Sequence, residues 1–231
     1  MRMSRHLGNY CGGSSWRNEY TEYDFIRLSY EFDYVMRIPT PVTSKYIKMV
    51  SRIRADEDLN LYAPIVLREI GYPGNSNRLM YGLYQYGSNM IIYNVSGANS
   101  GFNRFSYGQW IDLEFIYTET DGIIRINGID LDHETYSLDQ PVDCGARWTL
   151  FGKPDLVVSG SYSPNTQNPW NGTLQKVKFF DPSTNALLAD LRPVKRNSDQ
   201  QVGLFDISSK TFCIPTGQQG EVSSVFTVGN L

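Results

Sequence analysis

Three carboxylates at alternating positions are the first feature of this sequence that could carry out chemistry. Asp130, Asp132 and Glu134 lie two residues apart, so on a β-strand all three would point to the same side. Two such groups about 5 Å apart serve as nucleophile and acid/base in retaining glycoside hydrolases. A solvated strand face explains the same pattern, as it does for the weaker E-F-D stretch at 31–33. We therefore expect the chain not to be an enzyme, with glycoside hydrolysis as the less favoured alternative.

Nucleophilic and phosphate-binding chemistry have less support. The chain has only two histidines and no G-x-S-x-G stretch, so it offers no hydrolase triad. The Gly-rich stretches NSGFNRFSYGQW and YPGNSNR lack the strand-to-helix context of a phosphate-binding loop. Three widely spaced cysteines, Cys11, Cys144 and Cys213, favour free thiols over a disulfide framework or a zinc site.

Aromatic side chains beside amides are the stronger candidates for a binding role. Sugar C–H faces stack on aromatic rings, while sugar hydroxyls need paired donors and acceptors. Two stretches have this mixture, GSYSPNTQNPWNG and YGLYQYGSNMIIYN. The candidate glycan-binding residues are Tyr162, Asn165, Gln167, Asn168, Trp170, Tyr84 and Tyr86. The alternative is that the strand tyrosines pack half-buried between two sheets and that Trp170 caps the core.

Composition and charge restrict the partners. The 231 residues are 41% hydrophobic and 19% charged, which is a globular composition. The net charge of -3 does not steer the chain toward nucleic acid or an anionic membrane. No apolar run reaches the roughly 18 residues of a spanning helix, and the first residues have no apolar centre typical of a signal peptide. We expect no nucleic acid and no membrane among the partners.

The first 19 residues differ from the rest. They are Gly/Ser-rich at 12–15 and carry Arg2, Arg5, His6 and Arg17 against a single Glu19. This composition predicts an N-terminal arm or linker over 1–19, which either orders on a partner or is a frayed end. Residues 20–231 would then form one domain.

From there on the apolar residues repeat with a period of two. The runs on either side of Gly87-Ser88-Asn89 predict a hairpin, and the dipeptides Asp121-Gly122 and Asn127-Gly128 predict tight turns in a three-stranded meander from Trp110 to about Leu131. Residues 46–54 fit a helix or a strand, and the surrounding pattern favours the strand. Many short strands between turn signals predict an all-β fold, an antiparallel β-sandwich.

The segment 171–220 contains three motifs that resemble a known family. They are G-x-Φ-x-x-Φ-x-Φ-Φ, L-x-P-V-K and G-L-Φ-D followed by an aromatic residue, where Φ is apolar. The matching residues are Gly172, Leu174, Val177, Phe179 and Phe180, then Leu191, Pro193, Val194 and Lys195, then Gly203, Leu204, Phe205, Asp206 and Phe212. These motifs resemble the closing part of laminin-G-like, concanavalin-A-like jelly-roll modules of bacterial surface proteins and bacteriophage structural proteins. Weaker similarity extends back to about residue 23.

The closing motif has a structural interpretation. We expect Gly172 and Gly203 to let the chain bend where two sheets approach, and Pro193 to end a strand. Asp206 is expected to accept hydrogen bonds from the turn at 207–210. The segment would then close the sandwich and bring the end of the chain beside its beginning.

The resemblance implies a function in binding. It implies a concanavalin A-like jelly roll whose concave face or loop rim binds glycans, with room for a calcium ion near loop carboxylates such as Asp121, Asp139 and Asp143. Otherwise no cofactor is expected. We expect a non-catalytic glycan-binding or adhesion module on a virion surface, or alternatively on a bacterial cell surface. Its partners would be a cell-surface polysaccharide, neighbouring virion or surface proteins bound through the arm, and further copies of the chain. The main alternative is a purely structural protein that packs through protein–protein contacts.

Overall fold

The computed structural model describes residues 16–28, 34–38, 46–56, 63–72, 75–94, 97–104, 106–118, 121–135, 148–151, 153–154, 166–167, 170–217 and 226–231. Several residues named above lie outside these ranges: residues 1–15 of the expected arm, the E-F-D stretch, Cys144, Asp139 and Asp143. In the described part of the chain, no helix is long and apolar enough to cross a membrane.

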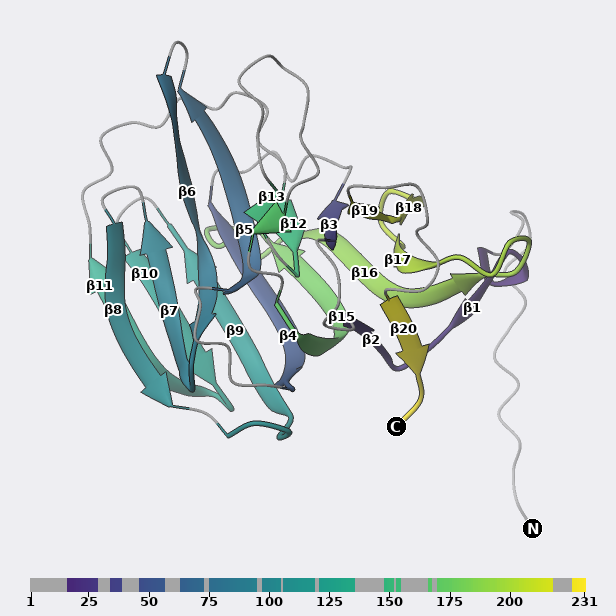
Figure 1. Cartoon of the computed structure of the whole chain (residues 1–231), viewed down its shortest axis with the longest axis horizontal. Helices are drawn as coiled ribbons and strands as arrows, with labels where there is room; N and C mark the ends of the chain where they lie inside the picture. Colours follow the sequence, from purple (N-terminus) through teal and green to yellow (C-terminus); the bar gives the residue numbers. More distant parts are fainter. Residues whose placement is uncertain are drawn as a thin grey trace.

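Two large antiparallel sheets form the molecule (Figure 1). Within the described residues the larger sheet has eleven strands, with β11-β10-β9-β4-β15-β16-β17-β18 in order and β1, β2 and β20 attached beside β15 and β16. Its strands are β1 (Tyr20–Glu22), β2 (Phe25–Leu28), β4 (Ile47–Ala55), β9 (Ile111–Tyr117), β10 (Asp121–Ile126), β11 (Ile129–Thr135), β15 (Gly172–Phe180), β16 (Leu187–Arg196), β17 (Val202–Asp206), β18 (Thr211–Cys213) and β20 (Phe226–Gly229).

The smaller sheet has the order β19-β3-β12-β5-β6-β7-β8. Its strands are β3 (Tyr34–Ile38), β5 (Ala63–Tyr72), β6 (Asn75–Tyr86), β7 (Asn89–Asn94), β8 (Gly97–Arg104), β12 (Trp148–Leu150) and β19 (Pro215–Gly217). A separate two-stranded ladder pairs β13 (Lys153–Pro154) with β14 (Thr166–Gln167). Edge strands β8 and β11 contact each other, so the two sheets also meet along that side.

The core lies between the two sheets. Alternation along β4 shows why, since Ile47, Met49 and Ile53 are buried while Arg52 is exposed on the opposite side. The strand predicted over 46–54 is therefore confirmed. Trp148 of the smaller sheet meets Phe179 of the larger one, with ring centroids 5.9 Å apart, so the inner faces interlock. The predicted antiparallel jelly-roll sandwich is the observed fold.

The residues of the tight turns determine where the hairpins form. Asn127 and Gly128 have φ angles of 52° and 80°, the left-handed backbone that a two-residue primed turn requires. The hairpin at Gly87-Ser88 is confirmed as well. The turn before β10 lies earlier than predicted, because the Thr118 amide donates to the Asp121 carbonyl at 2.8 Å and Asp121 already belongs to the strand.

The closing segment behaves largely as its motif predicts. Asp206, fully buried, accepts from the amides of Asp190 and Ser208, each at 3.0 Å, and from the Ser209 hydroxyl at 2.7 Å. β20 pairs with β2, so Phe226–Gly229 lie beside Phe25–Leu28, as expected for a segment that closes the sandwich. Gly203 does not lie at a bend between the two sheets: it lies inside β17, where a Cβ would overlap the Cys213 carbonyl oxygen and the Phe212 ring of the neighbouring strand β18.

Pro193 does not end a strand, and that expectation is wrong. It lies inside β16 opposite Leu204, where β16 leaves its neighbour β15 and pairs with β1 instead. A proline is tolerated there because it comes at the change of partner, and its carbonyl still accepts the Tyr23 amide at 2.9 Å.

Residues 16–19 of the expected arm pack against the sandwich. Residues Trp16–Asn18 form a 3-10 turn, and the Trp16 ring stacks on Phe205 with ring centroids 5.1 Å apart. The Glu19 carbonyl accepts the Asn197 amide at 2.8 Å. Residues 16–19 therefore pack with the sandwich, because Trp16 covers an aromatic ring on the outer face of β17.

Candidate functional site

The structure removes Trp170 from the candidate sugar contacts. Its side chain has no exposed surface, and its ring packs beside Phe151 with ring centroids 5.7 Å apart. The indole nitrogen donates to Gln85 Oε1 at 2.6 Å, and the Gln85 amide donates to the Gly87 carbonyl at 3.2 Å. A buried ring cannot stack on a ligand, so Trp170 belongs to the core, as its alternative interpretation held.

The tyrosines of β6 divide between core and surface. Tyr84 is 5% exposed and belongs to the core, so it too cannot form a platform. Tyr86 is 38% exposed at the hairpin. Gln167 lies in β14, but its side chain is outside the described part, as are Tyr162, Asn165 and Asn168 altogether. For these four residues the glycan-binding role stays a prediction.

The carboxylate strand shows no catalytic pair among its described side chains. Asp130 is exposed on β11, and its carboxylate is bound by the Arg125 guanidinium of the adjacent strand. The same guanidinium also donates to Glu114 at 2.8 Å, and these two acids hold the Arg125 pKa above its usual value. The side chains of Asp132 and Glu134 are outside the described part.

Metal-binding chemistry has no cluster to support it in the described residues, where no group of three or more His, Cys, Asp or Glu side chains comes together. Asp121, the calcium candidate within those residues, caps its own turn by accepting the Thr118 hydroxyl at 3.5 Å. Cys213 is a free, buried thiol, and burial raises its pKa to about 12. It is therefore a core residue.

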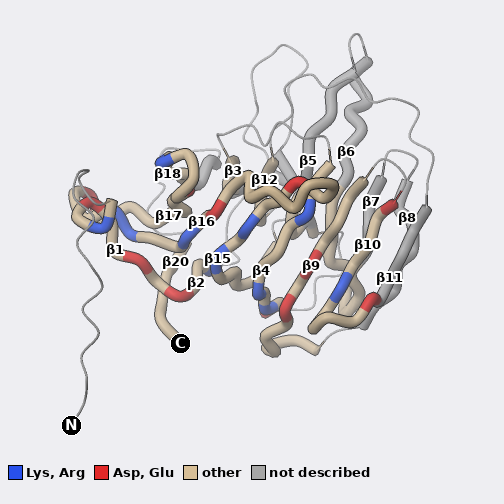
Figure 2. The backbone as a smooth tube through the Cα atoms, turned by 180° about the vertical axis from the view of Figure 1, so that it is seen from behind, with Lys and Arg blue, Asp and Glu red and all other residues tan. Residues whose placement is uncertain are grey.

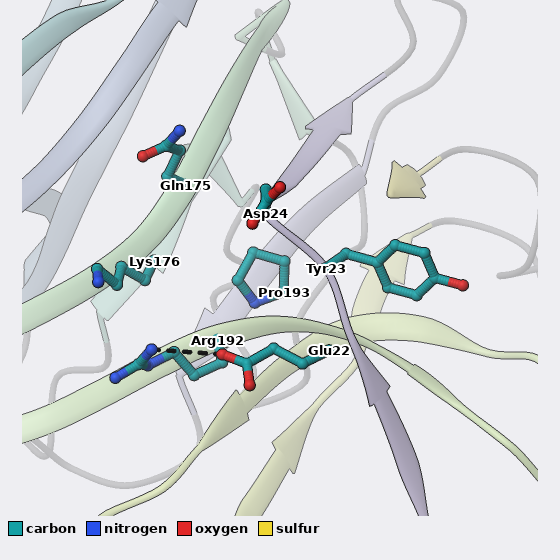
Figure 3. Close-up of a pocket in the computed structure, with 7 residues that line it drawn as sticks. All are labelled: Glu22, Tyr23, Asp24, Gln175, Lys176, Arg192 and Pro193. Carbon is teal, nitrogen blue, oxygen red and sulfur yellow. Dashed lines mark hydrogen bonds and ion pairs between the residues drawn. The ribbon is translucent and has the colours of Figure 1, made fainter. Parts of the chain in front are cut away.

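The structure has a hollow that none of the sequence candidates lines. It has a volume of about 120 Å³ and lies on the outer face of the larger sheet, where charged residues follow β16, β15, β4 and β9 (Figure 2). Its lining residues are Glu22, Tyr23, Asp24, Gln175, Lys176, Arg192 and Pro193 (Figure 3). We call it the bulge hollow.

Strand pairing creates the bulge hollow. β1 pairs with β16 and β2 pairs with β15, so the link Tyr23-Asp24 crosses from one strand to the other. Beneath that link β15 has a bulge between Leu174 and Val177, opposite Ile53 and Ser51 of β4. Leu174 and Val177 both point into the core, so the two residues between them are displaced together toward the outer face.

The bulge therefore presents Gln175 and Lys176 side by side. In an ordinary strand only one residue would lie between two core positions, and only one side chain would face outward. In Figure 3 the Lys176 side chain lies between those of Gln175 and Arg192, while the Tyr23 ring points away from them. Gln175 is half-buried and Lys176 is exposed.

An ion-pair chain forms the wall of the bulge hollow. Asp190 accepts from Arg192 through both oxygens, at 2.7 and 2.9 Å, and a third Arg192 nitrogen donates to Glu22 at 3.3 Å. Glu22 also pairs with Arg17 at 3.4 Å. Asp190 first, and then Glu22, hold the Arg192 pKa above its usual value. The wall is thus a fixed, charge-compensated network.

Trp110, a half-buried aromatic residue that precedes β9, is not open for stacking on a ligand. The guanidinium groups of Arg52 and Arg54 lie over the Trp110 ring, 5.8 and 5.2 Å from its centroid. Arg54 is itself held by Asp56 at 2.7 Å. Trp110 is therefore covered by neighbouring cations, and the polar bulge hollow is the better candidate for a ligand.

Sequence reasoning missed this site because its three segments are remote in sequence. One signal for it was present, since the L-Q-K-V stretch at 174–177 breaks the period-two alternation of β15. The two adjacent unspecified positions of the first closing motif fall on Gln175 and Lys176. A break of this kind inside a strand indicates a bulge, and bulges often lie beside functional sites.

No protein-family model matches this sequence, and no curated protein sequence matches it either. Among solved structures, the LG4-5 domain pair of the mouse laminin α1 chain has a TM-score of 0.51 at 10% identity, over 86% of this chain and 50% of the laminin chain. The native heptameric SAP-like pentraxin of Limulus polyphemus has a TM-score of 0.50 at 13% identity, over 70% of this chain and 76% of its own.

A mutant Trypanosoma rangeli sialidase with trans-sialidase activity also matches, with a TM-score of 0.45 and 12% identity over 58% of this chain. This chain spans a fifth of that sialidase and half of the laminin fragment. The laminin and pentraxin likenesses show the fold alone, and they confirm the laminin-G-like architecture predicted from the closing motif.

Proposed function

We propose that this chain is a non-catalytic carbohydrate-binding module and that its ligand docks in the bulge hollow. The observation that carries the proposal is the grouping of a carboxylate, an amide and an ammonium group, Asp24, Gln175 and Lys176, around one small cavity. Sugar hydroxyls both donate and accept hydrogen bonds, so they need such a mixed set of partners.

The size and rigidity of the bulge hollow support a small ligand unit. At about 120 Å³ it is smaller than the pockets of drug-sized ligands, so it would hold one sugar unit or a chain end. Gln175 and Lys176 lie within a sheet, and the Arg192 network fixes the opposite wall. A site built on strands keeps its geometry without the entropy cost of ordering a loop.

We further propose that the module acts on the surface of a virion, or alternatively of a bacterial cell, with residues 1–15 as its tether to neighbouring proteins. The support is the resemblance of 171–220 to modules of phage structural and bacterial surface proteins. Because Trp16 docks on Phe205, the tether would start from a fixed point on the sandwich.

A glycan array probed with the full chain tests the proposal. We expect retention on at least one class of oligosaccharide, a loss of about tenfold in Gln175→Ala, and no change in the matched surface variant Gln109→Ala. Absence of retention on every glycan would overturn the proposal and leave the structural alternative. New reducing ends that appear in wild type and vanish in Asp132→Asn would instead establish a hydrolase.

A further inference from the structure

We infer that the bulge hollow binds a sugar bearing a negative charge, a carboxylate or a sulfate, with the Lys176 ammonium group as its counter-ion. The inference rests on the proposed function, because it names the ligand class of the same site. It follows from which charged groups around the bulge hollow already have partners within the protein.

Both acids of the bulge hollow already have partners. Glu22 lies between two guanidinium groups, 3.4 Å from Arg17 and 3.3 Å from Arg192. Asp24 accepts the backbone amide of Leu231 at 3.0 Å. Glu22 is thereby neutralised, whereas Asp24 has this hydrogen bond but no cation among the described residues, and its second oxygen can accept from a ligand hydroxyl.

The guanidinium group of Arg192 also has its partners already. Its Nε and one terminal nitrogen donate to Asp190, and its other terminal nitrogen donates to Glu22. Its side chain is only 22% exposed. A ligand anion would have to break this paired network to reach Arg192, so the guanidinium shapes the wall and is not the anion receptor.

Among the cations that line the bulge hollow, Lys176 is the one without an ion-pair partner in the described residues. In the part of the chain that the structure describes, no carboxylate lies within ion-pair distance of its ammonium group, whereas Lys178, two residues further on, pairs with Asp190 at 3.8 Å. The bulge holds the Lys176 backbone in the middle of a sheet, and Lys176 lines the bulge hollow beside Arg192 (Figure 3). This ammonium group can pair with a negative group on a sugar whose hydroxyls bind at Asp24 and Gln175.

The strength of the ion pair between Lys176 and a ligand anion determines how much binding affinity should change when the charge is removed. An ion pair at a partly exposed site contributes enough for a change of about fivefold in affinity, and salt screens it. The remaining affinity would come from the hydrogen bonds of Gln175 and Asp24. Loss of the charge should therefore weaken binding of charged ligands and leave neutral ones unaffected.

The test is an array of matched pairs, in which each uronate-containing oligosaccharide stands beside its carboxyl-reduced form and each sulfated one beside its desulfated form. The full-length chain is compared with Lys176→Gln, Lys176→Arg and the surface control Lys210→Gln. Affinities for the best pair are then measured by titration calorimetry at 50 and 500 mM salt.

We expect the charged member of a pair to bind about fivefold more tightly, the preference to vanish in Lys176→Gln and at high salt, and to persist in Lys176→Arg and Lys210→Gln. The pair that shows the preference tells a carboxylate from a sulfate. Equal binding of charged and neutral members, or a preference that survives Lys176→Gln, would overturn the inference while the proposed function stands. No binding of any member would overturn both.

Discussion

Trp16 and Phe205 stack almost in parallel, with their ring centroids 5.1 Å apart and their planes at 19°, although they come from opposite ends of the chain. Tyr20 adds a second ring to Phe205 at 4.8 Å. Residues 16–20 are thereby fixed to the closing hairpin, and the same segment supplies Arg17, which pairs with Glu22 in the wall of the bulge hollow. Residues first assigned to a detached arm thus take part in the fold.

Trp16→Ala should lower the free energy of unfolding by about 1–2 kcal/mol, because an aromatic pair and its buried area are lost. Trp16→Phe keeps a ring over Phe205 and should lose less than half of that. Urea denaturation measures both variants. A Trp16→Ala protein as stable as wild type would show that this segment does not dock.

Trp170→Ala should lower the free energy of unfolding by about 3–5 kcal/mol, the range for removing a large buried aromatic side chain. Trp170→Phe retains the ring but removes the donor to Gln85, so its cost should be smaller. Denaturation midpoints are the readout, and a loss below 1 kcal/mol for Trp170→Ala would contradict the buried position.

Gly203→Ala should destabilise the protein by roughly 2–3 kcal/mol, because the added methyl group meets backbone and cannot be relieved by a rotamer change. Gly108→Ala is the comparison, since a Cβ there meets nothing within 4 Å and the cost comes from its φ of +71°. That cost should be about 1–2 kcal/mol. Thermal melting measures the destabilisation of both variants. If Gly203→Ala destabilised the protein no more than Gly108→Ala, that result would argue against the close contact between β17 and β18.

Asp181 links stability to pH. The Ser183 hydroxyl, and then the amides of Thr184 and Ser183, donate to its carboxylate and lower its pKa to about 2 from the usual 3.8. A depressed pKa stabilises the fold above about pH 4, and this contribution disappears as pH falls through 2. Asp181→Asn should therefore be less stable than wild type at pH 7, with the gap closing toward pH 2. A gap that stays constant or widens in acid would contradict this assignment.

Local patterns predicted much of the fold. The alternation of 46–54, the Asn127-Gly128 turn and the Asp206 cap each depend on residues close in sequence, so their physics is readable from the sequence. The burial of Trp170 is not, because a tryptophan beside an amide-rich loop fits a binding rim and a core cap equally well. Its hydrogen bond to Gln85, on a strand of the other sheet, decides between them.

The bulge hollow shows the limit of sequence reasoning more clearly. Asp24, Lys176 and Arg192 come together only because β1 pairs with β16 and β2 pairs with β15. Sequence spacing carries no information about that pairing. The break in alternation at 174–177 indicates a bulge, but it does not indicate which segments will surround it.

The most direct test of the binding site is an NMR titration of the isotope-labelled full chain with the best glycan from the array. We predict that the amide chemical-shift changes concentrate on Asp24, Gln175 and Lys176, while the amide resonance of Tyr86 at the β6–β7 hairpin does not move. Shifts confined to that hairpin or to the 155–165 segment, with the bulge residues unchanged, would contradict it.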